Sequence, residues 1–404
     1  RQWLQRASAQ GHEQAVRLLA EQTQAPKPTR KAAAKSEWIA TVAKPVVAGQ
    51  SVDGGQSVDG GQAVAGRQAA AGDAASAAAT ANARPPLMEA AWRGQVAAVE
   101  ALLRDAPEID QADTDGNTAL AMAALGGHRR VIDILLKGGA AIEHRNRDGR
   151  TPVMMAATKG HGDALAGLIA AKARIDTRDA KELFPLDLAI LGCHTDAVTQ
   201  LLRSGAKPVV HTESGMTPLM RAATTCEPAM IKALLQHGAG TGSSMEARDR
   251  RNRTALWHAA DHGNASAAAT LLAAGADAGA IDADGDLPLM RSLERGRVEV
   301  ALALLPATKP IGHVNRSGNT PLILAARAGA TILVSGLIQR GAPVDSRNVL
   351  GDTALMTAVR EGHAETVDIL VRSGADKSLR NKKREQARDI ARASAQPMIM
   401  SLFD

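Results

Sequence analysis

Four histidines have the residue type and the regular spacing that a metal site would need. They are His128, His161, His194 and His363, and the first three follow one another at a constant interval. In a stacked repeat this spacing separates successive side chains by about 8–10 Å, whereas a metal needs its nitrogen ligands about 2 Å away. No cluster of cysteines or carboxylates accompanies them. The pattern predicts structural histidines at helix-ending turns, with no metal and no cofactor.

The two cysteines of the chain, Cys193 and Cys226, are the other reactive candidates. They are separated by the same interval as the histidines, at equivalent positions where most repeats have glycine. If the stacked helices are about 8–10 Å apart, the Cα atoms exceed the ~7 Å limit for a disulfide. We therefore predict two free thiols. With only two cysteines there is no disulfide framework, so the cysteine count does not decide between the cytosol and export.

Motifs for catalysis, nucleic-acid binding and membrane insertion are missing from the sequence. It has no Gly-x-x-x-x-Gly-Lys phosphate loop, no nucleophile elbow and no Cys-x-x-Cys pair. The net charge of +6 is spread along 404 residues rather than gathered in one segment, unlike the basic face of a nucleic-acid binder. No apolar run approaches the ~18–20 residues of a membrane span. We expect neither an enzyme, nor a nucleic-acid binder, nor a membrane-inserted protein.

A repeat of about 33 residues organises most of the chain. The residue two positions after each turn glycine recurs at this interval, with a single longer step between Thr217 and Thr254. The full series is Thr118, Thr151, Phe184, Thr217, Thr254, Leu287, Thr320, Thr353 and Gln386. One step back from Thr118 lies Pro85, which opens a further unit. The period predicts about ten units, each made of a turn, a helix, a second turn and a second helix.

Each recurring residue within a unit has a physical reason. Threonine caps the first helix, and the proline that follows is tolerated in the first helical turn. The Ala-Ala pair keeps this helix thin, and the Leu-Leu pair of the second helix is expected to be buried between units. A left-handed turn is predicted at the helix-ending glycines, which are Gly94, Gly127, Gly160, Gly263, Gly296, Gly329 and Gly362.

These strings resemble ankyrin repeats. The match is carried by Asn146-Arg147-Asp148-Gly149-Arg150-Thr151-Pro152, by Ala156-Ala157, by Gly160-His161 and by similar strings in the other units. For residues 84–404 the resemblance implies an all-α solenoid of about ten helix-turn-helix units joined by short β-hairpin-like turns. The last unit is polar, as a terminal cap requires.

Methionine replaces the usual ankyrin histidine in several units, at Met88, Met154, Met220, Met290 and Met356. Methionine fills irregular spaces in cores, so the pattern predicts core filler. A methionine-lined binding groove is the alternative.

The stretch 1–83 differs from the rest of the chain. Residues 1–22 resemble the junction of two Sel1-like (TPR-like) helical repeats, through Trp3 and Gln10-Gly11-His12; an isolated ankyrin hairpin is the alternative. Residues 23–83 have low complexity and predict a flexible linker, or a segment that becomes ordered on a partner. The sequence begins at Arg1, so we expect upstream residues to be missing, which leaves export and localisation undecided.

The repeat is irregular between Asp179 and Arg253. Glu182 replaces a hairpin glycine, both cysteines replace helix-ending glycines, and a short insertion precedes the basic run Arg250-Arg251-Asn252-Arg253. A non-glycine residue in a left-handed turn costs about 1–2 kcal/mol. The stretch is either drift in a tolerant array or a specialised binding segment, and we predict the main binding site there.

The ankyrin resemblance implies a concave protein-binding face built from hairpin tips and inner-helix ends. Mapped onto this sequence, the contact positions are Trp92, Arg93, Arg147, Arg150, Lys159, Met216, Arg250, Arg251, Arg253, His262, Arg316, Leu350 and Arg360. The many arginines favour a partner with an acidic surface. The expected function is a protein-binding scaffold or adaptor within a larger assembly. The alternatives are an inhibitor or immunity-type protein, or the regulatory region of an enzyme whose catalytic part lies upstream. Low aromatic content and abundant alanine point to a bacterial source.

Overall fold

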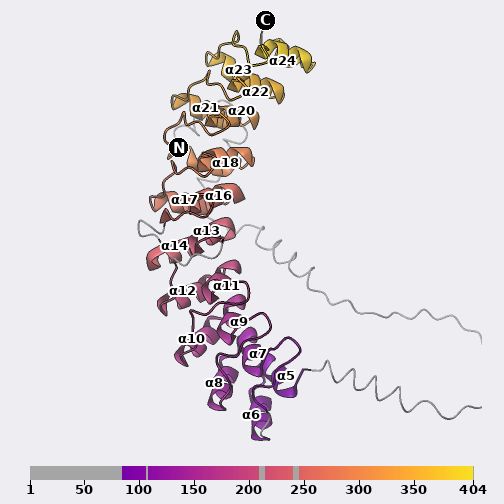
Figure 1. Cartoon of the computed structure of the whole chain (residues 1–404), viewed down its shortest axis with the longest axis vertical. Coiled ribbons are helices and arrows are strands. Elements are labelled where there is room, and N and C mark those ends of the chain that lie inside the picture. The colour runs from indigo at the N-terminus through magenta and orange to yellow at the C-terminus, as the bar shows by residue number, and fades with distance from the viewer. Residues whose placement is uncertain (1–83, 106–107, 209–213, 240–244, 404) are drawn as a thin grey trace, which may run out of the picture. The chain divides into compact units, whose positions relative to one another are not determined.

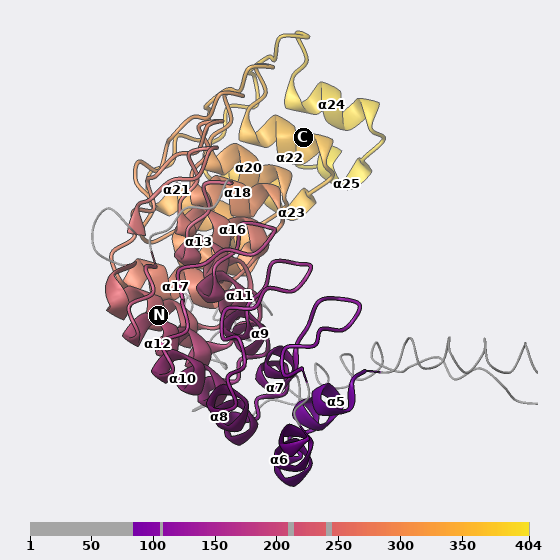
Figure 2. The same ribbon diagram turned by 60° about the horizontal axis from the view of Figure 1, so that its bottom comes forward.

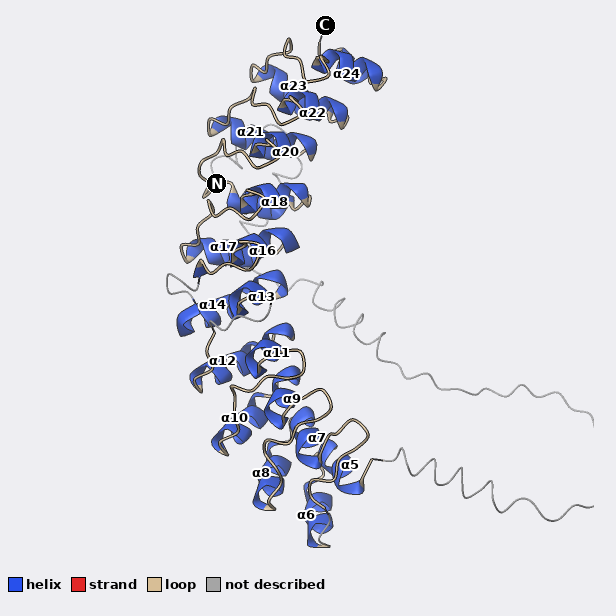
Figure 3. Cartoon of the chain, in the orientation of Figure 1, coloured by secondary structure: helices blue, strands red, loops and turns tan. Residues whose placement is uncertain are grey.

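The computed structural model describes residues 84–105, 108–208, 214–239 and 245–403. The predicted Sel1-like remnant at residues 1–22 and the predicted linker at residues 23–83 lie outside the described residues. The described residues contain helices and loops and no strand (Figure 3). None of their helices is long and apolar enough to cross a membrane.

In the described residues, ten pairs of short helices stack in chain order (Figure 1). The first, or inner, helices are α5 (Pro86–Trp92), α7 (Ala119–Gly126), α9 (Pro152–Lys159), α11 (Pro185–Leu191), α13 (Pro218–Thr225), α16 (Ala255–His262), α18 (Pro288–Glu294), α20 (Pro321–Arg327), α22 (Ala354–Arg360) and α24 (Ala387–Ala393). The second, or outer, helices are α6 (Val96–Arg104), α8 (Arg129–Lys137), α10 (Gly162–Ala170), α12 (Thr195–Arg203), α14 (Pro228–Leu234), α17 (Ala265–Ala273), α19 (Val298–Leu304), α21 (Thr331–Gln339), α23 (Ala364–Arg372) and α25 (Pro397–Met400).

Each pair is one repeat, so the expected all-α solenoid of about ten units is confirmed. We number the pairs as units 1 to 10 and call the contact between two neighbours a joint, as in joint 4–5. In the described residues, the loop that leads from an outer helix to the next inner helix ends in a hairpin, which we call a finger (Figure 2). In unit 5 a π-helical turn at Leu235–Ala239 extends α14.

Small side chains form the layers between units. The Ala-Ala pairs of the inner helices are fully buried, for example Ala156 and Ala157 in α9. One leucine of each outer helix is also fully buried in units 2 to 9, namely Leu135, Leu168, Leu201, Leu234, Leu271, Leu304, Leu337 and Leu370. The five repeat methionines are buried as well, at 0–1% exposure. They fill the core, and the alternative of a methionine-lined groove is wrong.

The caps and turns follow the residue types. Five threonine side chains accept a hydrogen bond from the backbone N–H three residues later, at Thr118, Thr217, Thr254, Thr320 and Thr353. The seven helix-ending glycines all have a left-handed φ between 63° and 79°. Glu182 and Cys193 share this conformation, with φ of 60° and 53°. Cys226 takes a different turn, with an extended backbone at φ −83° and ψ 160°.

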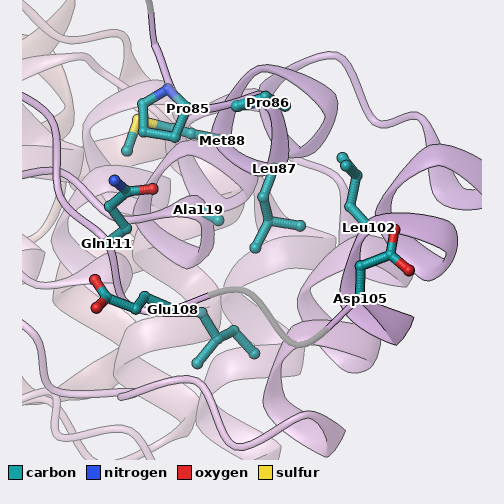
Figure 4. A pocket seen from close by; sticks show the side chains of 10 residues that line it. Pro85, Pro86, Leu87, Met88, Leu102, Asp105, Glu108, Gln111 and Ala119 are labelled. Atoms are coloured by element: carbon teal, nitrogen blue, oxygen red, sulfur yellow. The ribbon is translucent and has the colours of Figure 1, made fainter.

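The two ends of the array differ. Unit 10 presents charged side chains such as Lys382, Lys383 and Arg388, in keeping with a polar cap. In unit 1, by contrast, Leu102 is only half-buried, although its equivalents in units 2 to 9 are fully buried. A cavity of about 160 Å³ opens beside it, between α5, α6 and the following loop (Figure 4). In the described part of the chain, the first unit is therefore built like an interior one.

Candidate functional site

Every regular finger is shaped by one carboxylate or amide side chain. The Oδ1 atom of Asp113 accepts hydrogen bonds from the backbone N–H groups of Asp115 (2.9 Å) and Asn117 (2.8 Å). Asn315 and Asn348 act in the same way in later fingers. Asp and Asn favour such turns because their side chains reach the backbone two residues on. The fingers are thus fixed before any partner arrives.

A ladder of polar side chains joins consecutive fingers, and sequence reasoning missed it. Each rung joins the residue that precedes a helix-capping position to an Asp or Asn 29 residues later in the sequence. In four rungs the donor is the side-chain amide Nδ2 of the later residue. The rungs are Asn146 to Asn117 (3.0 Å), Asn315 to Asp286 (2.7 Å), Asn348 to Asn319 (3.2 Å), Asn381 to Asp352 (2.9 Å) and the ion pair of Arg150 with Asp179 (3.3 Å). The signal in the sequence was a pair of polar residues at this fixed separation.

Arginines at the finger bases also hold neighbouring units together. The guanidinium of Arg248 donates to the backbone oxygen of Ile281 in the next finger, at 2.8 Å. Arg145 and Arg347 donate to the backbone oxygens of Arg178 and Arg380 in the same way. Part of the arginine excess along the fingers is therefore used inside the array.

Several predicted contact arginines are committed to carboxylates of the array. Arg360 pairs with both oxygens of Asp352, at 2.6 and 3.0 Å. Burial acts to raise the pKa of Asp352, but hydrogen bonds from Arg360 and Asn381 outweigh it and leave the pKa lowered. The other committed side chains are Arg93 with Glu89, Arg150 with Asp179, Arg251 with Asp284 and Arg253 with Asp249.

The remaining predicted contact residues are mostly exposed. Trp92 at the end of α5 is 41% exposed, and Leu350 at a finger tip is 61% exposed. Exposed side chains that form no ion pair or side-chain hydrogen bond with any described residue are Arg147, Lys159, Arg250 and Arg316. His262 is exposed at the end of α16, with its Nδ1 3.0 Å from the backbone oxygen of His258. Met216 is half-buried against the core.

A largely buried charged cluster surrounds Trp257 where units 6 and 7 meet. The guanidinium groups of Arg253 and Arg291 lie over the indole ring, at 4.9 and 5.1 Å from its centre. Asp249 accepts from Arg253 at 2.7 Å and lies 3.0 Å from the Nε2 atom of His258. Burial lowers the pKa of His258 from its ordinary value of 6.5, which favours the neutral ring. The cluster fixes the basic finger to its helix and leaves Arg250 at the tip.

The four repeat histidines bridge neighbouring inner helices, as predicted for a structural role. Each ring Nε2 donates to a backbone oxygen 36 residues earlier, at the end of the preceding inner helix. The acceptors are Trp92 for His128 (2.8 Å), Leu125 for His161 (3.1 Å), Thr158 for His194 (3.1 Å) and Arg327 for His363 (3.0 Å). The described residues contain no group of His, Cys, Asp and Glu able to hold a metal.

The prediction of two free thiols is wrong, because Cys193 and Cys226 form a disulfide across joint 4–5. Their Cα atoms are 5.4 Å apart, within the range for a disulfide. The expected separation of about 8–10 Å is a distance between helix axes. At the ends of α11 and α13 the chains approach more closely, because Ala189, Ala222 and Ala223 leave little side-chain volume between them.

Joint 4–5 also holds a buried carboxylate. The Nε atom of Arg221 lies 3.5 Å from Asp187, whose side chain is 3% exposed. Burial raises the pKa of Asp187, although the backbone N–H of Phe184 and the charge of Arg221 act in the opposite direction. A cavity of about 370 Å³ adjoins the pair, lined by Phe184, Asp187, Lys207 and Pro218 among others.

Comparison with known proteins relates most of the array to one family. A family model described as ankyrin repeats (3 copies) matches residues 87–179, 186–282, 241–311 and 289–381, which is more than half of the chain. Curated proteins give no match. Among solved structures, the ankyrin repeat domain of Bcl-3, described as a unique member of the IkappaB protein family, matches with a TM-score of 0.47 and 29% identity. The match covers 54% of this chain and 97% of that chain.

Proposed function

Because this chain belongs to the ankyrin repeat family, whose repeats generally mediate interactions between proteins and are typically not enzymes, we propose that it binds a partner protein as a scaffold or adaptor. The binding face consists of the ends of the inner helices and the finger tips. In this role the chain is one subunit of a larger assembly.

The observation that carries this proposal is a set of exposed side chains at the inner-helix ends and finger tips. Trp92 and Leu191 stand exposed at the ends of inner helices, at 41% and 53%, and Leu350 stands at a finger tip. Arg147, Arg250 and Arg316 occupy the same tip position in three different fingers. Exposed Trp and Arg are frequent anchors of protein interfaces.

The three tip arginines favour a partner with an acidic surface. Arg251 and Arg253 belong to the same basic run but pair with Asp284 and Asp249. Reversing their charges would break contacts inside the array as well as contacts with a partner. Among the predicted contact arginines, those left available to a partner are therefore Arg147, Arg250 and Arg316.

The test is affinity capture with a charge-reversed variant, Arg147→Glu/Arg250→Glu/Arg316→Glu. The matched control, Arg104→Glu/Arg130→Glu/Arg203→Glu, reverses three exposed arginines on outer helices. We expect the wild-type and control chains to capture the same protein, with an affinity that falls at high salt, and the tip variant to lose about tenfold or more. Equal capture by both variants would exclude the tip site, and no specific capture by any chain would exclude the function.

The composition of the captured complex distinguishes a scaffold or adaptor from the two alternative functions. Several subunits that purify together support a scaffold or adaptor. A single tightly bound enzyme supports an inhibitor, and catalytic activity of a longer chain supports a regulatory region.

A further inference from the structure

The finger that leads into unit 4 lacks the polar residue that begins a rung of the ladder in five other units. Leu183 occupies the position held by Asn117, Arg150, Asp286, Asn319 and Asp352 in those units. Its side chain provides neither an amide nor a carboxylate, so it cannot form the rung that joins regular fingers. Leu183 therefore gives joint 4–5 no rung of the kind that connects five other pairs of described units.

The histidine bridge between inner helices is also replaced at joint 4–5. Unit 5 has Glu227 at the position where units 2, 3 and 4 have His128, His161 and His194. The Sγ atom of Cys226 instead lies 3.3 Å from the backbone oxygen of Ile190, 36 residues earlier, which is the separation spanned by each histidine. The disulfide thus stands where joints 1–2, 2–3, 3–4 and 8–9 have a hydrogen-bonded imidazole.

The buried ion pair at this joint contributes little net stability. The buried pair of Asp187 and Arg221 is desolvated, and the cavity of about 370 Å³ beside it removes packing contacts. In a linear repeat array, each unit touches only its neighbours, so one weak joint divides the array into two cooperative blocks. Here the blocks are units 1–4 and units 5–10.

We propose that the Cys193–Cys226 disulfide is a redox-dependent brace that couples these two blocks and so regulates the proposed binding face. The effect on binding rests on the proposed function, whereas the coupling of the two blocks is a property of the array alone. Disulfides persist in oxidising surroundings and are opened in reducing ones. Closed, the bond makes the array one continuous surface; open, it leaves two blocks that unfold and reorient separately.

The chemistry is thiol–disulfide exchange with a dithiol reductant. A thiolate of the reductant attacks the sulfur of half-buried Cys193, the S–S bond breaks, and the sulfur of Cys226 leaves as a thiolate that takes up a proton. The second thiol of the reductant then displaces Cys193. Two cysteine thiols and one cyclic disulfide of the reductant result. A partner that spans both blocks loses the advantage of simultaneous contact when the blocks separate.

The test is hydrogen exchange of the full chain, read by mass spectrometry at increasing urea. Peptides from units 2–3 and units 7–9 report on the two blocks, with and without dithiothreitol. We expect coincident urea midpoints in the oxidised chain and midpoints about 1 M apart in the reduced chain. Coincident midpoints in both states, or separate midpoints in both, would overturn the proposal.

Two variants provide the controls. Cys226→Ala should show separate midpoints whether or not dithiothreitol is present. Cys193→Gly removes the same bond while relieving a left-handed residue, so it remains informative if Cys226→Ala fails to fold. Failure of coupling would leave partner capture intact, whereas a chain that couples its blocks but captures nothing would refute the proposed function alone.

Discussion

Joint 8–9 and joint 4–5 connect neighbouring repeat units through different contacts. At joint 8–9, Asn348 donates to Asn319, and His363 donates to the backbone oxygen of Arg327. At joint 4–5, a disulfide replaces the histidine bridge, and Leu183 stands where a polar rung would begin. The regular joint depends on several small contacts, whereas the irregular one combines a covalent bond with the ion pair of Asp187 and Arg221.

This difference shows at which joint a single chemical change can alter the coupling between repeat units. Hydrogen bonds of about 1 kcal/mol each recur in many joints away from joint 4–5. The loss of any one of them therefore removes only a small part of the stability of those units. A covalent bond at one joint concentrates the coupling in two atoms. A change of redox state therefore acts on one place in the array and leaves the other joints as they were.

The largest effect is expected from removal of the disulfide. Cys226→Ala removes the cross-link between cysteines that are 33 residues apart. In the unfolded chain, closing a loop of this length corresponds to about 3–4 kcal/mol of conformational entropy. Urea denaturation of the oxidised wild-type and variant chains measures this loss. A loss below about 0.5 kcal/mol, the size of an ordinary surface substitution, would mean that joint 4–5 is held like the others.

A smaller loss is expected when a regular joint is broken at Asp352. Asp352→Ala leaves Arg360 and Asn381 without their acceptor, which costs about 1–3 kcal/mol for buried polar groups. Asp352→Asn retains an acceptor for Asn381 and should lose less. Equal losses in the two variants would show that the rung to Asn381 contributes little.

The rung at Asp286 is expected to make joint 7–8 sensitive to pH. Burial, reinforced by Glu294 and Asp282 against the hydrogen bond from Asn315, raises the pKa of Asp286 from 3.8 to about 6. A raised pKa in the folded state gives a stability contribution that is complete below pH 3.8 and is lost as the pH rises through about 6.

Asp286→Asn retains the acceptor and removes the titration. We expect it to stabilise the chain by about 1–3 kcal/mol at about pH 8 and to have little effect at about pH 4. Urea denaturation at the two pH values checks this. A gain that is the same at both values would contradict the assigned pKa shift.

The smallest effect is expected at the left-handed turn of Glu182. Glu182→Gly should stabilise the chain by about 1 kcal/mol, because glycine adopts φ of 60° without cost. The matched change in a regular finger, Gly149→Ala, should destabilise, since its φ is 72° and a Cβ would lie 3.0 Å from the backbone nitrogen of Ala180. Shifts in thermal midpoint of the same sign in both variants would contradict this contrast.

Most of the fold was predictable because it repeats. The period fixes the units, the left-handed glycines, the buried methionines and the bridging histidines, each of which depends on local sequence. The disulfide was not predictable, because it depends on how closely α11 and α13 approach at their ends. The role of Arg360 was equally hidden, because exposure at a predicted contact position does not reveal that Asp352 lies beside it.

The most direct test of the account is a thiol titration of the denatured chain, purified in air without a reductant. The brace at joint 4–5 predicts no reactive thiol before reduction and two after it. Two reactive thiols before reduction would contradict the account.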